Sequence, residues 1–140
     1  MAGSASNAIE NRIANGIFRG QTVVVPTALY LALFEGDPGE DGSVNEVSST
    51  IRTWYSRRDL AAGGAVGTAF SAPVDGTVSN LNSIDFNPIT TSAVTITHMA
   101  IFDAPTGGTM LTYSNLASPK TYEVNDIPTL PVGALVVTVS

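Results

Sequence analysis

The residues of this sequence best suited to chemistry are a single histidine, His98, and a loose group of carboxylates. With one histidine and no cysteine, a zinc site would need carboxylates for its remaining ligands, and a catalytic triad would need further partners of the right type. His98 lies within a run of apolar and β-branched residues. We therefore expect a buried histidine held by a hydrogen bond, not a catalytic or metal-binding one.

The acidic residues are densest in one short stretch, residues 35–43, which is punctuated by glycine. Its spacing lacks the alternating ligands and late glutamate of an EF-hand, which favours a solvated loop over a calcium site. Paired carboxylates could act on glycosides, but no aromatic platform accompanies them. Gly107 and Gly108 lack the lysine and following helix of a phosphate loop, and Asp103 is expected to form a turn beside Pro105. The sequence thus predicts no catalytic residue, no metal and no cofactor.

The composition points to a folded chain that binds protein. Hydrophobic residues make up 44% of the 140 residues and charged residues only 13%, the reverse of a disordered composition. So little charge is unusual on a free monomer, which suggests that a partner covers part of the surface. A net charge of −6 argues against contact with nucleic acid through phosphates. The sequence shows no secretory signal and no membrane-spanning run, so we expect synthesis in the cytoplasm and no membrane partner.

The elements that must position these residues are organised around a strand–turn–strand segment, Ala93–Tyr113. An apolar, β-branched run over residues 93–102 is followed by a turn cluster with Pro105 and two glycines, and then by a second apolar run. Both faces of the first run are largely apolar, which predicts a central strand. Strict alternation places five side chains on one face: Val94, Ile96, His98, Ala100 and Phe102.

A short N-terminal helix is predicted before this strand. Asn7 is its expected N-cap, with Glu10 completing a capping box, and Gly20 is its expected end. A helix of about three turns does not stand alone in water. It must therefore dock on its own core or clamp a neighbouring subunit, using a stripe formed by Ile9, Ile13 and Ile17 with Phe18 nearby.

The remaining chain reads as short strands separated by turns. Strands are expected within residues 21–25, 27–34, 51–60, 66–70, 83–86, 121–124 and 134–139. The predicted fold class is therefore all-β, an antiparallel β-sandwich or jelly roll with one short N-terminal helix. We expect two parts, an N-terminal arm and helix over residues 1–26 and a β-sandwich domain over residues 27–140.

Candidate interface residues come from the N-terminal arm and from a segment rich in arginine. Trp and Arg are enriched in protein interfaces, so residues 51–60 could supply anchors. The alternative is a half-buried Trp54 covered by arginine stems. The full set of candidates is Ile9, Ile13, Ile17, Phe18, Val23, Val25, Arg52, Trp54, Arg57 and Arg58.

Several spaced segments resemble a family of small virion proteins of tailed phages. They are residues 30–34, 37–39, 46–48, 97–104, 106–108, 119–120 and 133–138. Members of this family are described as tail-fibre or capsid-associated proteins. In length and layout the chain is similar to the jelly-roll cement protein on the capsid of a Bordetella phage.

The resemblance implies a structural, non-enzymatic virion protein, expected on the capsid surface. Its expected function is that of a cement or decoration protein that staples subunits of the major capsid protein. A homodimer is expected, with a trimer as the alternative. A tail-fibre or baseplate module is the alternative function. A carbohydrate-binding sandwich, for which Trp54 and Tyr55 are the available aromatics, and an enzyme are the remaining classes.

Overall fold

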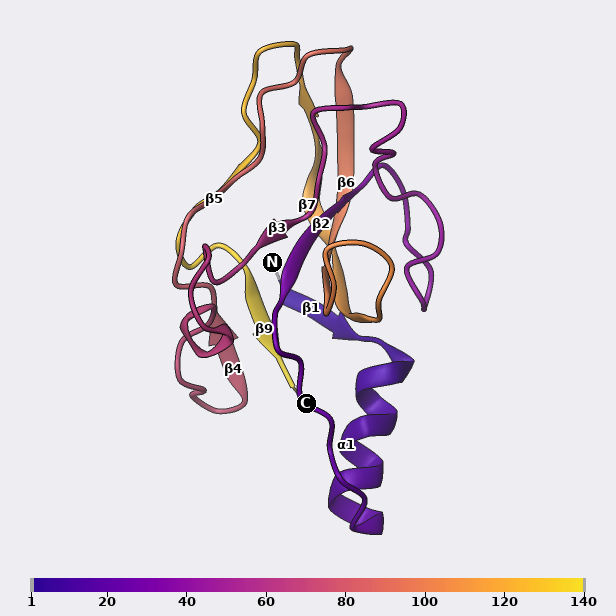
Figure 1. Cartoon of the computed structure of the whole chain (residues 1–140), viewed down its shortest axis with the longest axis vertical. Helices are drawn as coiled ribbons and strands as arrows, with labels where there is room; N and C mark the ends of the chain where they lie inside the picture. Colours follow the sequence, from indigo (N-terminus) through magenta and orange to yellow (C-terminus); the bar gives the residue numbers. More distant parts are fainter. Residues whose placement is uncertain (1, 140) are drawn as a thin grey trace.

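The computed structural model describes residues 2–139 as a mostly β molecule from which one helix projects (Figure 1). The main sheet has seven strands in the order β3-β2-β6-β7-β1-β9-β4, and β5 and β8 form a separate two-stranded ladder. The β1–β9 pair is parallel and the other pairs are antiparallel. The elements are β1 (Ala2–Ala5), α1 (Asn7–Arg19), β2 (Tyr30–Phe34), β3 (Arg58–Asp59), the 3-10 helix η1 (Val66–Thr68), β4 (Thr77–Ser79), β5 (Ile84–Asp85), β6 (Val94–Phe102), β7 (Met110–Tyr122), β8 (Thr129–Leu130) and β9 (Val136–Thr138).

The predicted hairpin is confirmed as the longest feature of the sheet. Strands β6 and β7 pair from Val94 opposite Tyr122 to Phe102 opposite Met110, and β2 pairs with the other edge of β6. Asp103 has the expected turn role, because its carboxylate accepts a hydrogen bond of 2.7 Å from the amide of Thr109. Of the strand expected at residues 121–124, only residues 121–122 are strand, and they form the far end of β7.

A β-bulge in this hairpin overturns the predicted alternation of side chains along β6. The register shifts between Ile96, which pairs with Lys120, and His98, which pairs with Asn115. The bulged stretch of β7 contains Pro119, which has no amide to donate to a ladder. Across this irregularity the alternation along β6 breaks, so Val94 and Ile96 share a core with Met99 and Ile101 instead of with Ala100 and Phe102.

The sheet buries apolar side chains on both faces. The larger core includes Leu31, Leu33, Ile96 and Ile101, and residues from β5, β8 and the connecting loops complete it. The smaller core lies on the other face and consists of Ala32, Phe34, Ala100, Phe102 and Met110. Loop 35–46 adjoins this second core, because Gly42 lies so close to Phe102 and Met110 that a Cβ there would be 2.6 Å from the phenyl ring.

Strand β1 joins the two halves of the main sheet. It pairs with β7 on one side, Ala5 opposite Thr112, and with β9 on the other, Ala2 opposite Val136. Residues 2–5 are small and carry no β-propensity signal, so the sequence indicates only an extended segment there. The strand is defined by its two partners.

The predicted all-β class with one N-terminal helix is confirmed, but no jelly roll or closed barrel is present in residues 2–139. Several predicted strands are wrong. Residues 21–25 form no strand, residues 51–57 are mainly turns that leave only β3 at Arg58–Asp59, and residues 66–68 form η1. With these segments outside the sheets, β5 and β8 are left as two-residue strands and cannot form the second large sheet of a sandwich.

Candidate interface site

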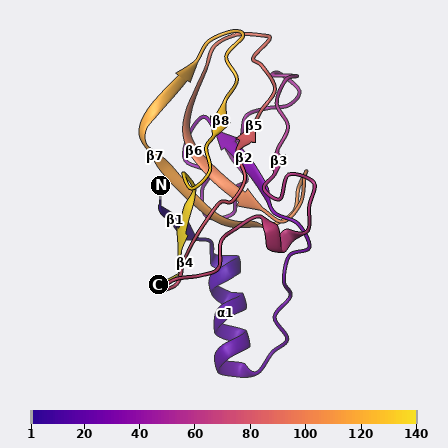
Figure 2. The same ribbon diagram turned by 90° about the vertical axis from the view of Figure 1, so that its left-hand side faces the viewer.

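The structural feature best suited to recognition is a projecting arm, defined here as residues 7–26, which comprises α1 and the segment that returns from it (Figure 2). Ser6, not the predicted Asn7, is the N-cap of α1, and its hydroxyl oxygen accepts from the amide of Ile9 at 3.4 Å. The same hydroxyl donates to the carbonyl of Met110 at 2.6 Å. One buried serine thus fixes where the arm leaves the sheet.

Three further contacts define the arm. Arg12 and Asp103 form an ion pair of 3.6 Å that ties α1 to the β6–β7 turn. Gly20 ends the helix in the left-handed region, as predicted, and the amide of Gln21 donates to the carbonyl of Asn15. The returning chain packs on the helix at Gly16, where a Cβ would lie 2.2 Å from Val23. The arm is therefore a helix with a returning segment, residues 21–26, folded against it. This segment is called the strap.

The outer part of the arm exposes large apolar side chains. Of the predicted stripe, Ile9 packs against the larger core, whereas Ile17 is 72% exposed and the neighbouring Phe18 is 83% exposed. The strap adds further exposed side chains. The complete exposed set is Ile13, Ile17, Phe18, Val23, Val24 and Val25. Several large apolar side chains exposed on one short segment make the arm a candidate protein contact site.

An apolar hollow of about 190 Å³ lies where the arm joins the sheet. Ile9 and Ile13 line its helix side, while Phe70, Val78 and Val137 line its sheet side. These residues are far apart in the sequence, so no local pattern predicts the hollow. Its lining is almost wholly nonpolar, which favours an apolar occupant over a polar ligand.

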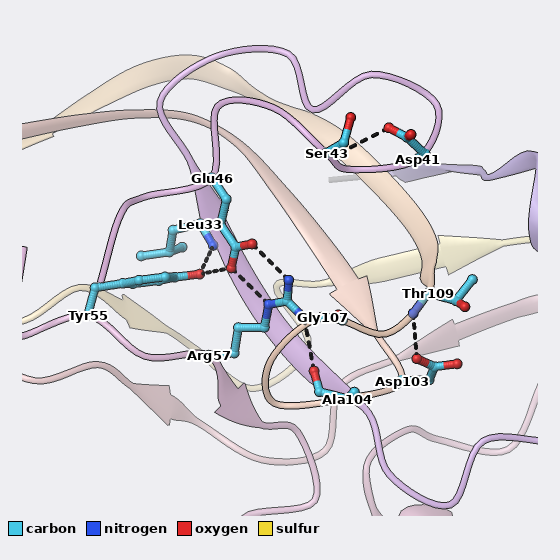
Figure 3. Close-up of polar contacts among 10 residues, drawn as sticks. All are labelled: Leu33, Asp41, Ser43, Glu46, Tyr55, Arg57, Asp103, Ala104, Gly107 and Thr109. Atoms are coloured by element: carbon cyan, nitrogen blue, oxygen red, sulfur yellow. Dashed lines mark hydrogen bonds and ion pairs between the residues drawn. The ribbon is translucent and has the colours of Figure 1, made fainter. Parts of the chain in front are cut away.

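The predicted arginine segment forms an internal network centred on Arg57 (Figure 3). Arg57 makes a bidentate pair with Glu46, with both N–O distances at 2.8 Å, and donates to the carbonyls of Ala104 and Gly107. Its guanidinium lies 3.6 Å from the centroid of the Phe102 ring. Arg57 therefore clamps three separate segments of the chain together.

Tyr55 completes this network from the core side. Its hydroxyl donates to Glu46 at 2.7 Å and accepts from the amide of Leu33 at 3.2 Å (Figure 3). Burial of the ring, followed by the negative charge of Glu46, raises the pKa of Tyr55 far above its usual value of 10.0. Sequence reasoning missed Glu46, because a lone glutamate 11 residues before Arg57 has no distinctive spacing.

The other predicted anchors lie within the body of the molecule. Trp54 is only 4% exposed and belongs to the larger core, so it is more deeply buried than the half-buried alternative expected. Arg52 pairs with Glu35 at 2.9 Å and donates to the carbonyls of Ser92 and Ala93. Arg58 donates to Asn87. Contact of these residues with a partner stays a prediction, and their observed contacts are within the chain.

Loop 35–46 shows no arrangement for metal binding. The amide of Gly39 donates to Asp37, and the hydrogen bonds from Ser43 lower the pKa of Asp41. Within residues 2–139 no group of three or more histidine and acidic side chains could hold a metal ion. His98 is partly buried, and its Nδ1 lies 2.8 Å from the hydroxyl oxygen of Thr97. Among the described residues, no helix has the length and apolar character needed to cross a bilayer.

A small β protein with an internally satisfied polar network and an apolar projection has the features of a structural assembly protein. Comparison with known families supports this class: residues 4–138 match the family described as Podophage GP4 fiber I protein gp80. The chain belongs to this family of phage fibre proteins, and it is therefore a structural component of a phage virion. No curated protein matches the sequence.

The family narrows the expectations drawn from the sequence. The predicted resemblance to phage virion structural proteins is confirmed, and membership implies a structural role and not an enzymatic one. The family is described as a fibre protein. It therefore supports the tail-fibre alternative better than the capsid cement function that we expected first.

Proposed function

We propose that this chain is a structural subunit of a phage tail fibre and that its projecting arm makes the contact that holds it in the assembly. The body supplies a rigid platform, and the arm presents apolar side chains that a partner covers. The observation that carries the proposal is the exposure of Phe18 and Ile17, 83% and 72%, on a helix fixed to the sheet through Ser6.

The organisation of the body supports a load-bearing role. Arg57, Glu46 and Tyr55 are joined to one another by short hydrogen bonds. Such a network fixes loops relative to the sheet and leaves its buried groups with partners. The arm is different, because Ile17, Phe18, Val24 and Val25 are each more than 70% exposed.

The location is tested on virions of the phage that encodes this chain. We expect immunogold labelling with an antibody against the protein to mark fibres, and we expect virions assembled without the protein to have intact capsids and altered fibres. Labelling over the capsid faces, with copies bound to the major capsid protein, would support the cement function and contradict the fibre proposal.

The role of the arm is tested by complementation with variants. Phe18→Ser combined with Ile17→Ser should lower incorporation into virions at least about tenfold, because two large side chains no longer leave water on assembly. The matched control is Ile51→Ser, which changes a residue that is 75% exposed on a loop outside the arm. Equal incorporation of the arm variant and the control would show that the arm is not the assembly contact.

A further inference from the structure

We propose that the Phe18 side chain of one copy of this chain inserts into the apolar hollow of a second copy, so that the subunits assemble by a knob-and-hollow contact. This inference rests on the proposed function and names the partner of its arm. It requires that Phe18 and the hollow match in size and chemistry, that Phe18 cannot fill the hollow of its own chain, and that something favours a second copy as occupant.

The knob and the hollow match in size and chemistry. The hollow has a volume of about 190 Å³ and an almost entirely nonpolar lining that includes Leu29, Phe70 and Val137. Cavities of about 150 Å³ lined by such side chains accept a benzene ring. Phe18 presents a ring of this size, and it is the most exposed of the large hydrophobic side chains in the described chain.

The hollow cannot be filled by the Phe18 of its own chain. Ile9 and Ile13 line the hollow, and Phe18 follows them by nine and five residues on the same helix. At 1.5 Å per residue Phe18 lies roughly 14 Å beyond Ile9 and roughly 7.5 Å beyond Ile13 along the axis, and at 3.6 residues per turn its side chain points about 140–180° away from theirs. The base of the helix is held by Ser6 and by the Arg12–Asp103 pair. An intramolecular contact would require the helix to unwind.

The charge distribution favours the body of a second copy as the surface that the arm contacts. The projecting arm contains Arg12, Arg19 and Glu10 and has a net charge of +1, and since the whole chain has −6, the remainder has −7. Two arms therefore repel weakly, whereas an arm and a body attract. The attraction has a local counterpart. Arg19 follows Phe18 at the tip, and the exposed Asp75 occupies the turn before β4, whose Val78 lines the hollow.

The absence of native cysteine allows a direct test by disulfide trapping. Equal amounts of the single variants Phe18→Cys and Val78→Cys are mixed and oxidised, and mass spectrometry measures the mixed disulfide. We expect mixed dimers to exceed both same-variant dimers severalfold. The matched control replaces Phe18→Cys by Ile51→Cys, which is similarly exposed but outside the arm. An excess of Phe18→Cys dimers, or equal yields in the control, would overturn the proposal.

Light scattering on the unmodified chain gives an independent measurement. The wild-type chain should associate, and either Phe18→Asp or the hollow-filling Val78→Phe should weaken association at least about tenfold, with far-ultraviolet circular dichroism confirming that each variant folds. A wild-type chain that stays monomeric at about 100 µM would overturn the contact. A monomer that nevertheless labels fibres would leave the proposed function standing, whereas an associating chain absent from fibres would contradict only that function.

Discussion

At the scale of single residues, the contacts that matter most are those of Glu46. Its carboxylate accepts from Arg57 and from Tyr55, and the Arg57 side chain is only 7% exposed. Glu35 offers a matched comparison, because it also pairs with one arginine; it is 38% exposed and its partner Arg52 is 15% exposed, against 25% for Glu46. The two carboxylates differ in exposure and in partners, since Glu46 binds Arg57 through both oxygens and also accepts from Tyr55.

The replacement Glu46→Gln should lower the free energy of unfolding by about 2–4 kcal/mol, because it leaves the buried guanidinium of Arg57 without an opposite charge. Glu35→Gln should cost less than about 1 kcal/mol, since solvent screens that pair. Urea denaturation of both variants measures the difference. Equal losses would show that the Arg57 network contributes no more than a surface ion pair.

The raised pKa of Tyr55 predicts how the free energy of unfolding changes at alkaline pH. Its pKa is raised in the folded chain, so the unfolded chain loses the phenolic proton first as pH rises above about 10. The folded state then binds more protons than the unfolded state, and stability falls by up to about 1.4 kcal/mol for each pH unit from this residue. Below pH 10 this contribution is fully present.

Tyr55→Phe should therefore flatten the loss of stability above pH 10, although it lowers stability at neutral pH by about 1–2 kcal/mol because the amide of Leu33 and Glu46 each lose a partner. Urea unfolding between pH 8 and pH 11 gives the slope. The raised pKa of Tyr113, which arises from desolvation and from Glu40, adds a second contribution that stays in the variant. An unchanged slope would contradict the assignment to Tyr55.

Residue types alone predicted part of this chemistry. Asp103 and Gly20 were recognisable because turn and helix-end positions select few residue types. The bulge opposite Thr97 was not recognisable from residue types. Beyond it, Met99 and Ile101 lie in the same core as Ile96. A strand pattern assumes uninterrupted alternation, and only the pairing partner reveals where the alternation breaks.

At the scale of elements, loop 35–46 acts as the cover of the smaller core. Gly42 has φ +72° and lies against Phe102 and Met110, whereas Gly63 has φ +86° and no atom within 4 Å of the position that a Cβ would take. The two glycines share a left-handed backbone and differ in their surroundings. Replacing each glycine by alanine therefore separates the cost of backbone strain from the cost of a close contact.

Gly42→Ala should lower the free energy of unfolding by about 2–4 kcal/mol, because strain at positive φ adds to overpacking against the Phe102 ring. Gly63→Ala should cost only about 1 kcal/mol, from the backbone alone. Thermal or urea unfolding measures both. If the two variants lose the same stability, the loop does not pack on the smaller core as described.

The elements that the sequence predicted best are those whose signal is local. The β6–β7 hairpin has a turn cluster directly between its two strands. Helix α1 has a capping residue directly before its first turn and Gly20 at its end. Residues 21–25 are rich in valine yet form no strand, and residues 51–57 turn back on themselves. A β-propensity describes a side chain suited to a pleated surface, and it forms a strand only where the fold provides a partner edge.

At the scale of the whole molecule, β1 connects parts of the sheet that have no other shared strand. It lies between β7 and β9, so the β9–β4 pair reaches the rest of the main sheet through it. The expected division at residue 26 stays a prediction, but residues 2–5 belong to the same sheet as the strands that follow residue 27.

Deletion of residues 2–5 should therefore loosen β9 selectively. Amide hydrogen exchange at residues 136–138 should accelerate at least about tenfold, while β6 keeps its protection through β2 and the hairpin. The slow amides of β6 are an internal control for global unfolding. Unchanged exchange in β9 would contradict a linking role for β1.

The parallel pairing of Ala2 with Val136 has a consequence for how the chain reaches its final form. Residues 2–5 can pair only with β7 and β9, and both of these strands come from the second half of the sequence. Pairings between segments so distant in the chain form slowly. The join between β7 and β9 should therefore form after the local β6–β7 hairpin.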